Sequence, residues 1–182
     1  MRRYKAFIIG DRLFIPDHEE SRRLWSLGFF GKPLDEDKPR RPDFDSPLIL
    51  DPLEALYLLE RGIILVYDSD GEEVDFKRLY EIISESYHML NHKYTVYRDL
   101  RQRGYVVISG LKFGVDFAVY RHGPGIEHAP YLVDVVVSGS QVSGDELVRA
   151  GRLATSVRKR FVYAIVDKNG GVRYIMFKWF KP

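Results

Sequence analysis

Short runs of apolar and β-branched residues, separated by turn-forming residues, fill the second half of this chain of 182 residues. Runs of this kind predict strands, and one longer stretch opens with Ser143 and Glu146 at capping-box spacing, which predicts a helix. The predicted order is strand 105–108, strand 116–120, strand 131–137, helix 144–160, strand 161–166 and strand 172–179. This order predicts a compact mixed sheet flanked by helices.

The first half of the chain predicts a smaller α+β unit. Two short apolar runs on either side of Gly10 predict a hairpin. Asp17, Asp51 and Asp75 each stand before a helical pattern as an N-cap residue, so a helix is expected after each of them. Residues 33–47 hold four prolines and a dense mix of charges, and they predict a loop or an inserted arm.

The boundary between the two halves is expected between Glu85 and His92, where the periodicity changes phase and a new helix begins. Residues 1–87 are therefore predicted to form an N-terminal α+β domain with an inserted loop near 33–47. Residues 88–182 are predicted to form the C-terminal domain. The predicted fold class is α+β, with mixed α/β character in the C-terminal domain.

The composition narrows the possible classes of protein. The chain contains no cysteine, which excludes a disulfide framework, a thiolate metal site and a cysteine nucleophile. No apolar run approaches the roughly 20 residues that a membrane-spanning helix needs. A cytoplasmic protein without a membrane association is therefore expected.

Charge is distributed unevenly between the two halves. Residues 1–97 carry 14 basic and 19 acidic side chains, a net charge of −5, whereas residues 98–182 carry 14 basic and 7 acidic side chains, a net charge of +7. The basic half is the candidate surface for a polyanion such as nucleic acid.

Motifs of several common enzyme classes are missing from the sequence. It contains no phosphate-binding loop of the G-x-x-x-x-G-K-[ST] type, no H-E-x-x-H and no G-x-S-x-G. A metal-dependent nuclease stays open as an alternative through Asp116 and Asp134, although two carboxylates without further ligands form a weak metal site.

Residues 96–133 carry an extended pattern that continues through the C-terminal end of the chain. The stretches that form it are Tyr97-Arg98-Asp99-Leu100, Arg103-Gly104-Tyr105, Gly110-Leu111-Lys112-Phe113-Gly114, Asp116-Phe117, Tyr120, Glu127-His128-Ala129, Tyr131-Leu132-Val133, Ser156-Val157-Arg158-Lys159, Ala164-Ile165-Val166-Asp167 and Lys181-Pro182. This pattern resembles the signature of archaeal-type tRNA-intron endonucleases. The resemblance implies a nuclease-like C-terminal domain and the catalytic subunit of an RNA endonuclease. It also implies metal-independent excision of introns from precursor tRNA at bulge-helix-bulge motifs, with 2′,3′-cyclic phosphate and 5′-hydroxyl ends.

Three residues carry the catalytic prediction. The resemblance assigns Tyr120 as general base, His128 as general acid and Lys159 as the group that stabilises the transition state. These types suit RNA cleavage, because the neighbouring 2′-hydroxyl is itself the nucleophile and the protein supplies a base, an acid and positive charge. Since a phenol has a reference pKa of about 10, a nearby Lys159 ammonium is expected to lower the pKa of Tyr120. By position alone, His122 is an equally plausible acid.

Contacts with RNA are expected from basic residues of both halves. Arg152 stands seven residues before Lys159, two helical turns back, and resembles the family arginine that stacks on a base of the bulge. Further candidates for RNA binding are Arg149, Arg158 and Arg173, together with Lys38 in the arm at 33–47. The alternative for that arm is a linker without contact to RNA.

The expected partners are precursor tRNA and a second protein subunit. In similar homotetrameric enzymes the turn between the last two strands is acidic and docks into a basic cleft of another subunit. Residues 167–171 here hold one acid and one base, which favours a noncatalytic subunit that carries the acidic loop, in an (αβ)2 heterotetramer. The alternative is that this chain is itself a noncatalytic, RNA-binding subunit of the same complex.

Overall fold

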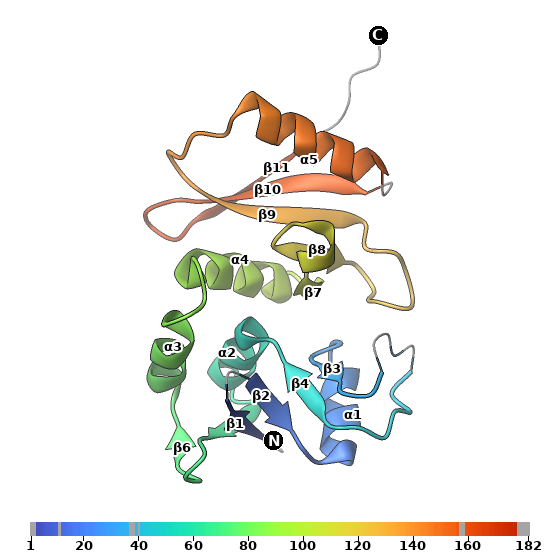
Figure 1. The fold of residues 1–182 in the computed structure, drawn as a ribbon, viewed down its shortest axis with the longest axis vertical. Coiled ribbons are helices and arrows are strands. Elements are labelled where there is room, and N and C mark those ends of the chain that lie inside the picture. The colour runs from blue at the N-terminus through green and yellow to red at the C-terminus, as the bar shows by residue number, and fades with distance from the viewer. Residues whose placement is uncertain (1–2, 11, 37–38, 40, 157–158, 178–182) are drawn as a thin grey trace. The chain divides into compact units, whose positions relative to one another are not determined.

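The computed structural model describes residues 3–10, 12–36, 39, 41–156 and 159–177. The chain forms two compact units, Met1–Leu90 and Asn91–Pro182, and each is built on a sheet of its own (Figure 1). Each sheet is mixed and is accompanied by helices. The predicted α+β fold class is confirmed.

The N-terminal unit contains a six-stranded sheet. Its strands are β1 (Tyr4–Ile9), β2 (Arg12–Ile15), β3 (Lys32–Pro33), β4 (Leu48–Leu50), β5 (Ile64–Tyr67) and β6 (Glu73–Val74), in the order β3-β4-β2-β1-β5-β6. β1 pairs antiparallel with β2, as the predicted hairpin requires, and parallel with β5. Gly10 has a φ of 64° at the hairpin turn, a conformation that glycine adopts without steric cost.

Three helices complete this unit, and an aspartate caps each of them as predicted. The helices are α1 (His18–Ser26), α2 (Pro52–Glu60) and α3 (Phe76–Ser84). The side chains of Asp17, Asp51 and Asp75 accept hydrogen bonds from backbone N–H groups of the first turn. Asp51 also forms a full capping box with Glu54, which satisfies two donors that a helix start leaves unpaired.

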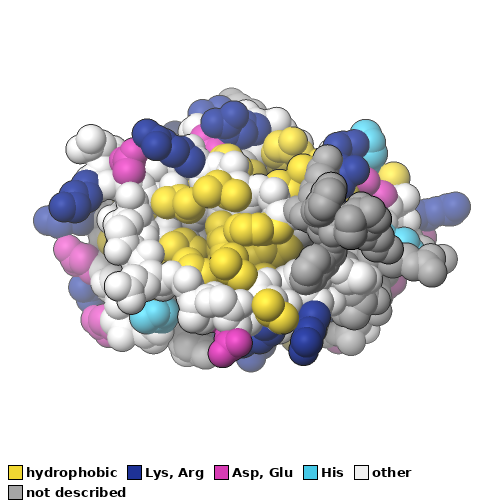
Figure 2. All heavy atoms as spheres, turned by 90° about the horizontal axis from the view of Figure 1, so that it is seen from above, with side chains coloured by type: hydrophobic (Ala, Val, Ile, Leu, Met, Phe, Trp, Pro, Cys, Tyr) yellow, Lys and Arg dark blue, Asp and Glu magenta, His cyan; other side chains and the backbone are white. Residues whose placement is uncertain are grey.

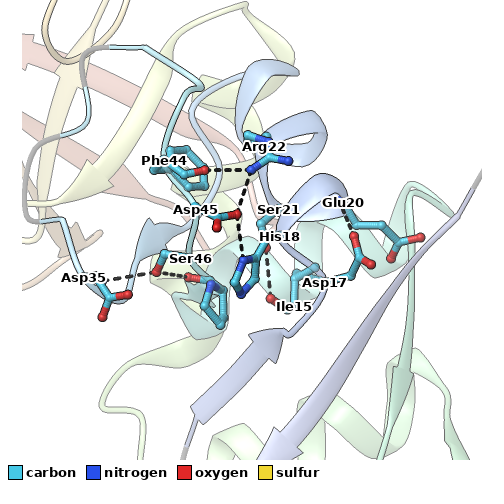
Figure 3. A network of polar contacts seen from close by, with 11 residues as sticks. Ile15, Asp17, His18, Glu20, Ser21, Arg22, Asp35, Phe44, Asp45 and Ser46 are labelled. Atoms are coloured by element: carbon cyan, nitrogen blue, oxygen red, sulfur yellow. Dashed lines mark hydrogen bonds and ion pairs between the residues drawn. The ribbon is translucent and has the colours of Figure 1, made fainter.

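The arm at 33–47 is held against α1 by its second half. The ring of Phe44 is only 6% exposed and packs edge-on against Trp25 at 6.0 Å. Arg22 donates to the carbonyl oxygen of Phe44 and to the carboxylate of Asp45, each at 3.1 Å, and His18 Nδ1 lies 2.9 Å from Asp45 (Figure 3). These contacts anchor the return of the arm, whereas Lys38 lies outside the described residues.

The C-terminal unit contains a five-stranded sheet in the order β11-β10-β9-β8-β7. The elements of this unit are α4 (Leu90–Gln102), β7 (Val106–Ser109), the 3-10 turn η1 (Leu111–Phe113), β8 (Phe117–Tyr120), β9 (Tyr131–Val137), α5 (Gly144–Ser156), β10 (Arg160–Val166) and β11 (Val172–Met176). β9 and β10 are parallel and the other neighbours are antiparallel. α5 forms the crossover that a parallel pair requires.

Opposite faces of this sheet meet different helices. Tyr97 of α4 packs its ring 6.1 Å from Phe117, which pairs with Val133. Asp134 and its row partner Tyr163 point to the other face, because neighbouring residues of a strand alternate, and there the charges of Glu146 and Arg149 on α5 act on Tyr163. α4 and α5 therefore cover the two faces of one sheet (Figure 1).

The predicted helix 144–160 is wrong at its C-terminal end. The described helix ends at Ser156, Lys159 is not helical, and Arg160 already belongs to β10. The backbone N–H of Arg160 donates to Pro130 at 2.9 Å, so pairing with β9 overrides the helical propensity of these basic residues. Over the described part of the chain, no helix is both long and apolar enough to cross a membrane.

Candidate active site

The three predicted catalytic residues lie at one end of the C-terminal sheet. At this end, the last register pair between β8 and β9 is Val119 with Tyr131, and Tyr131 is also paired with Arg160 of β10. Continuing both registers by one residue places Tyr120, Pro130 and Lys159 side by side. Residues in one row share a face, and neighbouring strands are about 4.8 Å apart, so the Tyr120 and Lys159 backbones are separated by about 10 Å.

Lys159 is fixed beside the segment that carries the predicted acid. Its ammonium group donates to the carbonyl oxygen of Ala129 at 2.8 Å and lies 5.3 Å from the centre of the Phe113 ring. Ala129 follows His128 directly. Burial, and then the charge of Lys112, lower the pKa of Lys159. The lysine is therefore a positive group held next to His128 in a partly desolvated position.

His128 is exposed at the end of a short loop, and the carboxylate of Glu127 organises that loop. Glu127 Oε1 accepts the backbone N–H of Arg121 at 2.5 Å and that of His122 at 2.6 Å. These bonds lower the pKa of Glu127 although burial opposes the change. One carboxylate thus ties the residues after Tyr120 to the residue before His128.

Tyr120 is nearly buried, with 5% of its surface exposed. Burial raises its pKa, and the negative charge of Glu127 raises it further. The expectation that Lys159 lowers the pKa of Tyr120 is therefore wrong for this structure, because the ammonium group is directed to Ala129 and desolvation dominates at the phenol. Near neutral pH the hydroxyl of Tyr120 is protonated.

Comparison with known proteins bears on this site. Residues 4–80 match the family model of the tRNA intron endonuclease N-terminal domain, and residues 90–174 match that of the tRNA intron endonuclease catalytic C-terminal domain. The chain belongs to the tRNA intron endonuclease family. The predicted resemblance is confirmed, and the chain is an endonuclease.

Curated relatives of this tRNA intron endonuclease match over nearly its whole length. A tRNA-splicing endonuclease of Hyperthermus butylicus is 49% identical over 182 residues, covering 98% of this chain and 99% of the relative. Those of Saccharolobus solfataricus and Saccharolobus islandicus are 45% and 46% identical over 179 residues, covering 97% of this chain and 98% of each relative. The family membership therefore extends over both units.

The predicted RNA-binding arginines of this tRNA intron endonuclease are spread over two elements. Arg149 and Arg152 lie exposed on α5 and line one depression of the surface, together with Asp145. Arg173 lies exposed on β11. Arg158, like Lys38, lies outside the described residues. The structure therefore brings Arg149 and Arg152 together on the helix that covers the Tyr120 face.

The carboxylates of the metal-dependent alternative are engaged by the protein itself. Lys93 lies 2.8 Å from Asp116, whose other oxygen accepts the N–H of Val135 at 2.8 Å. Asp134 accepts the N–H of Asp116 at 2.9 Å. Among the described residues, no group of three or more histidines, aspartates or glutamates is arranged to hold a metal ion. Both aspartates therefore serve to join β8 to β9.

Two features of the site were missed by reasoning from sequence. The first is the role of Glu127, whose carboxylate closes the loop. Its position directly before His128 in the motif is the sequence signal that could have indicated this role. The other is a cluster of Arg121, Tyr131 and Arg160 on the opposite face of the sheet, in which both guanidinium groups lie within 6 Å of the tyrosine ring centre. The sequence signal for this cluster is that an arginine directly follows Tyr120 and another directly follows Lys159.

Proposed function

We propose that this chain is the catalytic subunit of an enzyme that excises introns from precursor tRNA by metal-independent transesterification. The proposed substrate element is a bulge-helix-bulge, and the proposed products carry 2′,3′-cyclic phosphate and 5′-hydroxyl ends. The observation that carries the proposal is the strand register, which sets Tyr120 and Lys159 on one face at one sheet end, with His128 two residues before the intervening Pro130.

The chemistry assigns one task to each group. Tyr120, as phenolate, removes the proton of the 2′-hydroxyl, and the 2′-oxygen forms a bond to phosphorus. The bond from phosphorus to the 5′-oxygen breaks, and His128 in its protonated form donates a proton to that leaving oxygen. The Lys159 ammonium stabilises the negative charge that develops on the nonbridging oxygens.

The raised pKa of Tyr120 limits the amount of active base. Because burial and Glu127 disfavour the phenolate, only a small fraction of the enzyme holds ionised Tyr120 near neutral pH. A phenolate of high pKa is a correspondingly strong base, so that fraction reacts readily.

Cleavage of a bulge-helix-bulge RNA in the presence of EDTA tests the mechanism. The assembled enzyme is expected to cut with the chelator present and to leave cyclic phosphate ends. His128→Ala is expected to lower the single-turnover rate by roughly 10²- to 10⁴-fold. His122→Ala is the matched control, because it removes an exposed imidazole from the same loop. A metal requirement, or 3′-hydroxyl and 5′-phosphate ends, contradicts the proposal.

We propose further that the active enzyme contains a second, noncatalytic subunit that supplies an acidic loop. In this chain the one acid of the turn at 167–171, Asp167, already accepts the N–H groups of Asn169 at 2.8 Å and Gly171 at 2.9 Å. Its negative charge is therefore committed to the turn itself. An intermolecular acidic contact would have to come from another chain, as in an (αβ)2 heterotetramer.

An exposed apolar surface supports assembly with another protein. Five large apolar side chains are between 38% and 48% exposed: Leu147 and Val148 on α5, Ile175 and Met176 on β11, and Phe177 directly after β11. Seen from the α5 side, apolar side chains gather in a hollow of the surface (Figure 2). Contiguous exposed apolar patches mark protein interfaces. Purification of this chain alone tests the subunit proposal, because full splicing activity without a partner contradicts it.

A further inference from the structure

A basic and aromatic cluster lies on the α4 face of the C-terminal sheet, at the same sheet end as the candidate active site. Tyr131 is its centre, with the guanidinium carbon of Arg121 5.6 Å and that of Arg160 5.9 Å from the ring centre. Arg121 also donates to the Tyr131 hydroxyl at 2.6 Å. Tyr105 packs edge-on against the same ring at 6.3 Å. Four residues from four neighbouring segments thus form one cluster.

The strand geometry relates this cluster to the candidate catalytic residues. Arg121 follows Tyr120, and Arg160 follows Lys159. Successive residues of a strand point to opposite faces, so each strand end directs a candidate catalytic group to one face and an arginine to the other. The candidate catalytic residues and the two arginines are therefore separated only by the thickness of one sheet. An RNA strand that crosses this end of the sheet can contact both.

The two arginines carry charge that no described carboxylate neutralises by an ion pair. Arg103, on the same face, lies 2.7 Å from Asp99 and is paired in this way. The charge of Glu127 acts on Arg121 without an ion pair between them, and Glu127 Oε1 is engaged by the backbone N–H groups of the loop. Arg121 and Arg160 are both exposed. Two exposed guanidinium groups placed together without an ion-paired carboxylate attract an anion, and the planar fork of donors on each group matches a phosphate.

We propose that Arg121 and Arg160, oriented by Tyr131, bind a backbone phosphate of the RNA strand next to the scissile phosphate. This inference rests on the proposed function and extends it to a substrate contact outside the three candidate catalytic groups. The tyrosine ring holds the two forks near one another, and Tyr105 adds an aromatic surface beside them. Contacts of this kind position an RNA strand without reading its sequence.

Binding of a bulge-helix-bulge RNA over a range of salt concentrations tests the proposal. The parent is His128→Ala in the assembled enzyme, which removes the proposed acid so that binding is measured without cleavage. Arg121→Gln together with Arg160→Gln is compared with Arg61→Gln together with Arg78→Gln, two exposed arginines of the N-terminal unit. Both pairs remove the same charge, so a difference between them reports position and not total charge.

The Arg121 and Arg160 double variant is expected to bind the RNA roughly tenfold more weakly near physiological salt. Its plot of log K against log salt is expected to be shallower by about 0.7 to 0.9, the change in slope that the loss of one phosphate contact produces. Lysines at both positions are expected to restore most of the slope while affinity stays reduced, because lysine keeps the charge without the planar fork.

Three results overturn the inference. The first is an affinity and slope equal to those of the Arg61 and Arg78 control. The second is a reduced mass of the assembly without a change in slope, which would make the cluster a protein interface. The third is a large drop in melting temperature, which would make it structural. If the wild-type enzyme binds the RNA without cutting it, the proposed function fails while the binding comparison still decides this inference.

Discussion

Removing the carboxylate of Glu127 tests how the loop between Tyr120 and His128 is held. Glu127 Oε1 accepts two backbone N–H groups, at 2.5 and 2.6 Å. Glu127→Ala leaves both donors to water and allows the loop to move. We expect a slower reaction without loss of the fold, because the loop is outside the sheet and His128 is exposed.

The size of the effect follows from these two bonds. A hydrogen bond to a charged group contributes about 1.5 to 3 kcal/mol, and partial exposure of Glu127 reduces this to about 1 kcal/mol for each bond. Losing about 2 kcal/mol of loop ordering corresponds to a roughly 30-fold lower single-turnover rate, at about 1.4 kcal/mol for each factor of ten. Glu127→Gln keeps an oxygen acceptor of about half the strength, so a roughly fivefold loss is expected.

The assay is single-turnover cleavage of the precursor RNA at saturating enzyme, with the melting temperature measured in parallel. The matched control is Asp68→Ala, because Asp68 Oδ1 also accepts two backbone N–H groups of a turn, those of Asp70 and Glu72, in the N-terminal unit. Glu127→Gln also removes the charge that raises the pKa of Tyr120, so its rate is expected to rise with pH at lower pH than that of the wild type. Cleavage by Glu127→Ala at the rate of the Asp68 control refutes the reasoning.

Two further predictions concern ionisable groups. Burial and the charge of Lys112 lower the pKa of Lys159, so the wild-type enzyme is expected to lose activity at alkaline pH, where the lysine loses its proton. Arginine keeps its charge at that pH, so Lys159→Arg is expected to shift this loss of activity to higher pH in a profile of rate against pH. If the alkaline side of the profile does not change, the proposed role of Lys159 is contradicted. Asp99 accepts bonds from Arg103 at 2.7 Å and Tyr174 at 2.6 Å, and although burial alone would raise its pKa, these bonds lower it. The contribution of Asp99 to the free energy of unfolding is therefore fully present above the pKa of Asp99 in the unfolded chain, about 4. This contribution is lost as the pH falls through the lower pKa of Asp99 in the folded protein. Asp99→Asn is expected to lower the free energy of unfolding by about 1 to 3 kcal/mol at neutral pH. Each kcal/mol lowers the melting temperature by roughly 2 to 4 °C. Equal melting temperatures of the wild type and the variant at pH 7 would contradict this prediction.

Local chemistry explains which elements were predictable. The starts of α1, α2 and α3 follow from single aspartates, because an N-cap depends only on the side chain and the backbone of the next few residues. The short strands β4 and β6 were missed, because they are formed by pairing with β2 and β5 and have little pattern of their own. The C-terminal end of α5 was misplaced for the same reason, since pairing with β9 extends β10 to Arg160.

The sequence by itself determined the family, the fold class and the identity of the candidate catalytic residues, because a motif and its order along the chain are properties of residue types. Only the tertiary structure decided that Tyr120 and Lys159 share a row, since strand register arises from hydrogen bonds between distant segments. It also decided the direction of the Tyr120 pKa, which depends on burial and on the neighbouring Glu127. Both outcomes depend on the surroundings of a side chain in the folded protein, and residue order alone does not specify them.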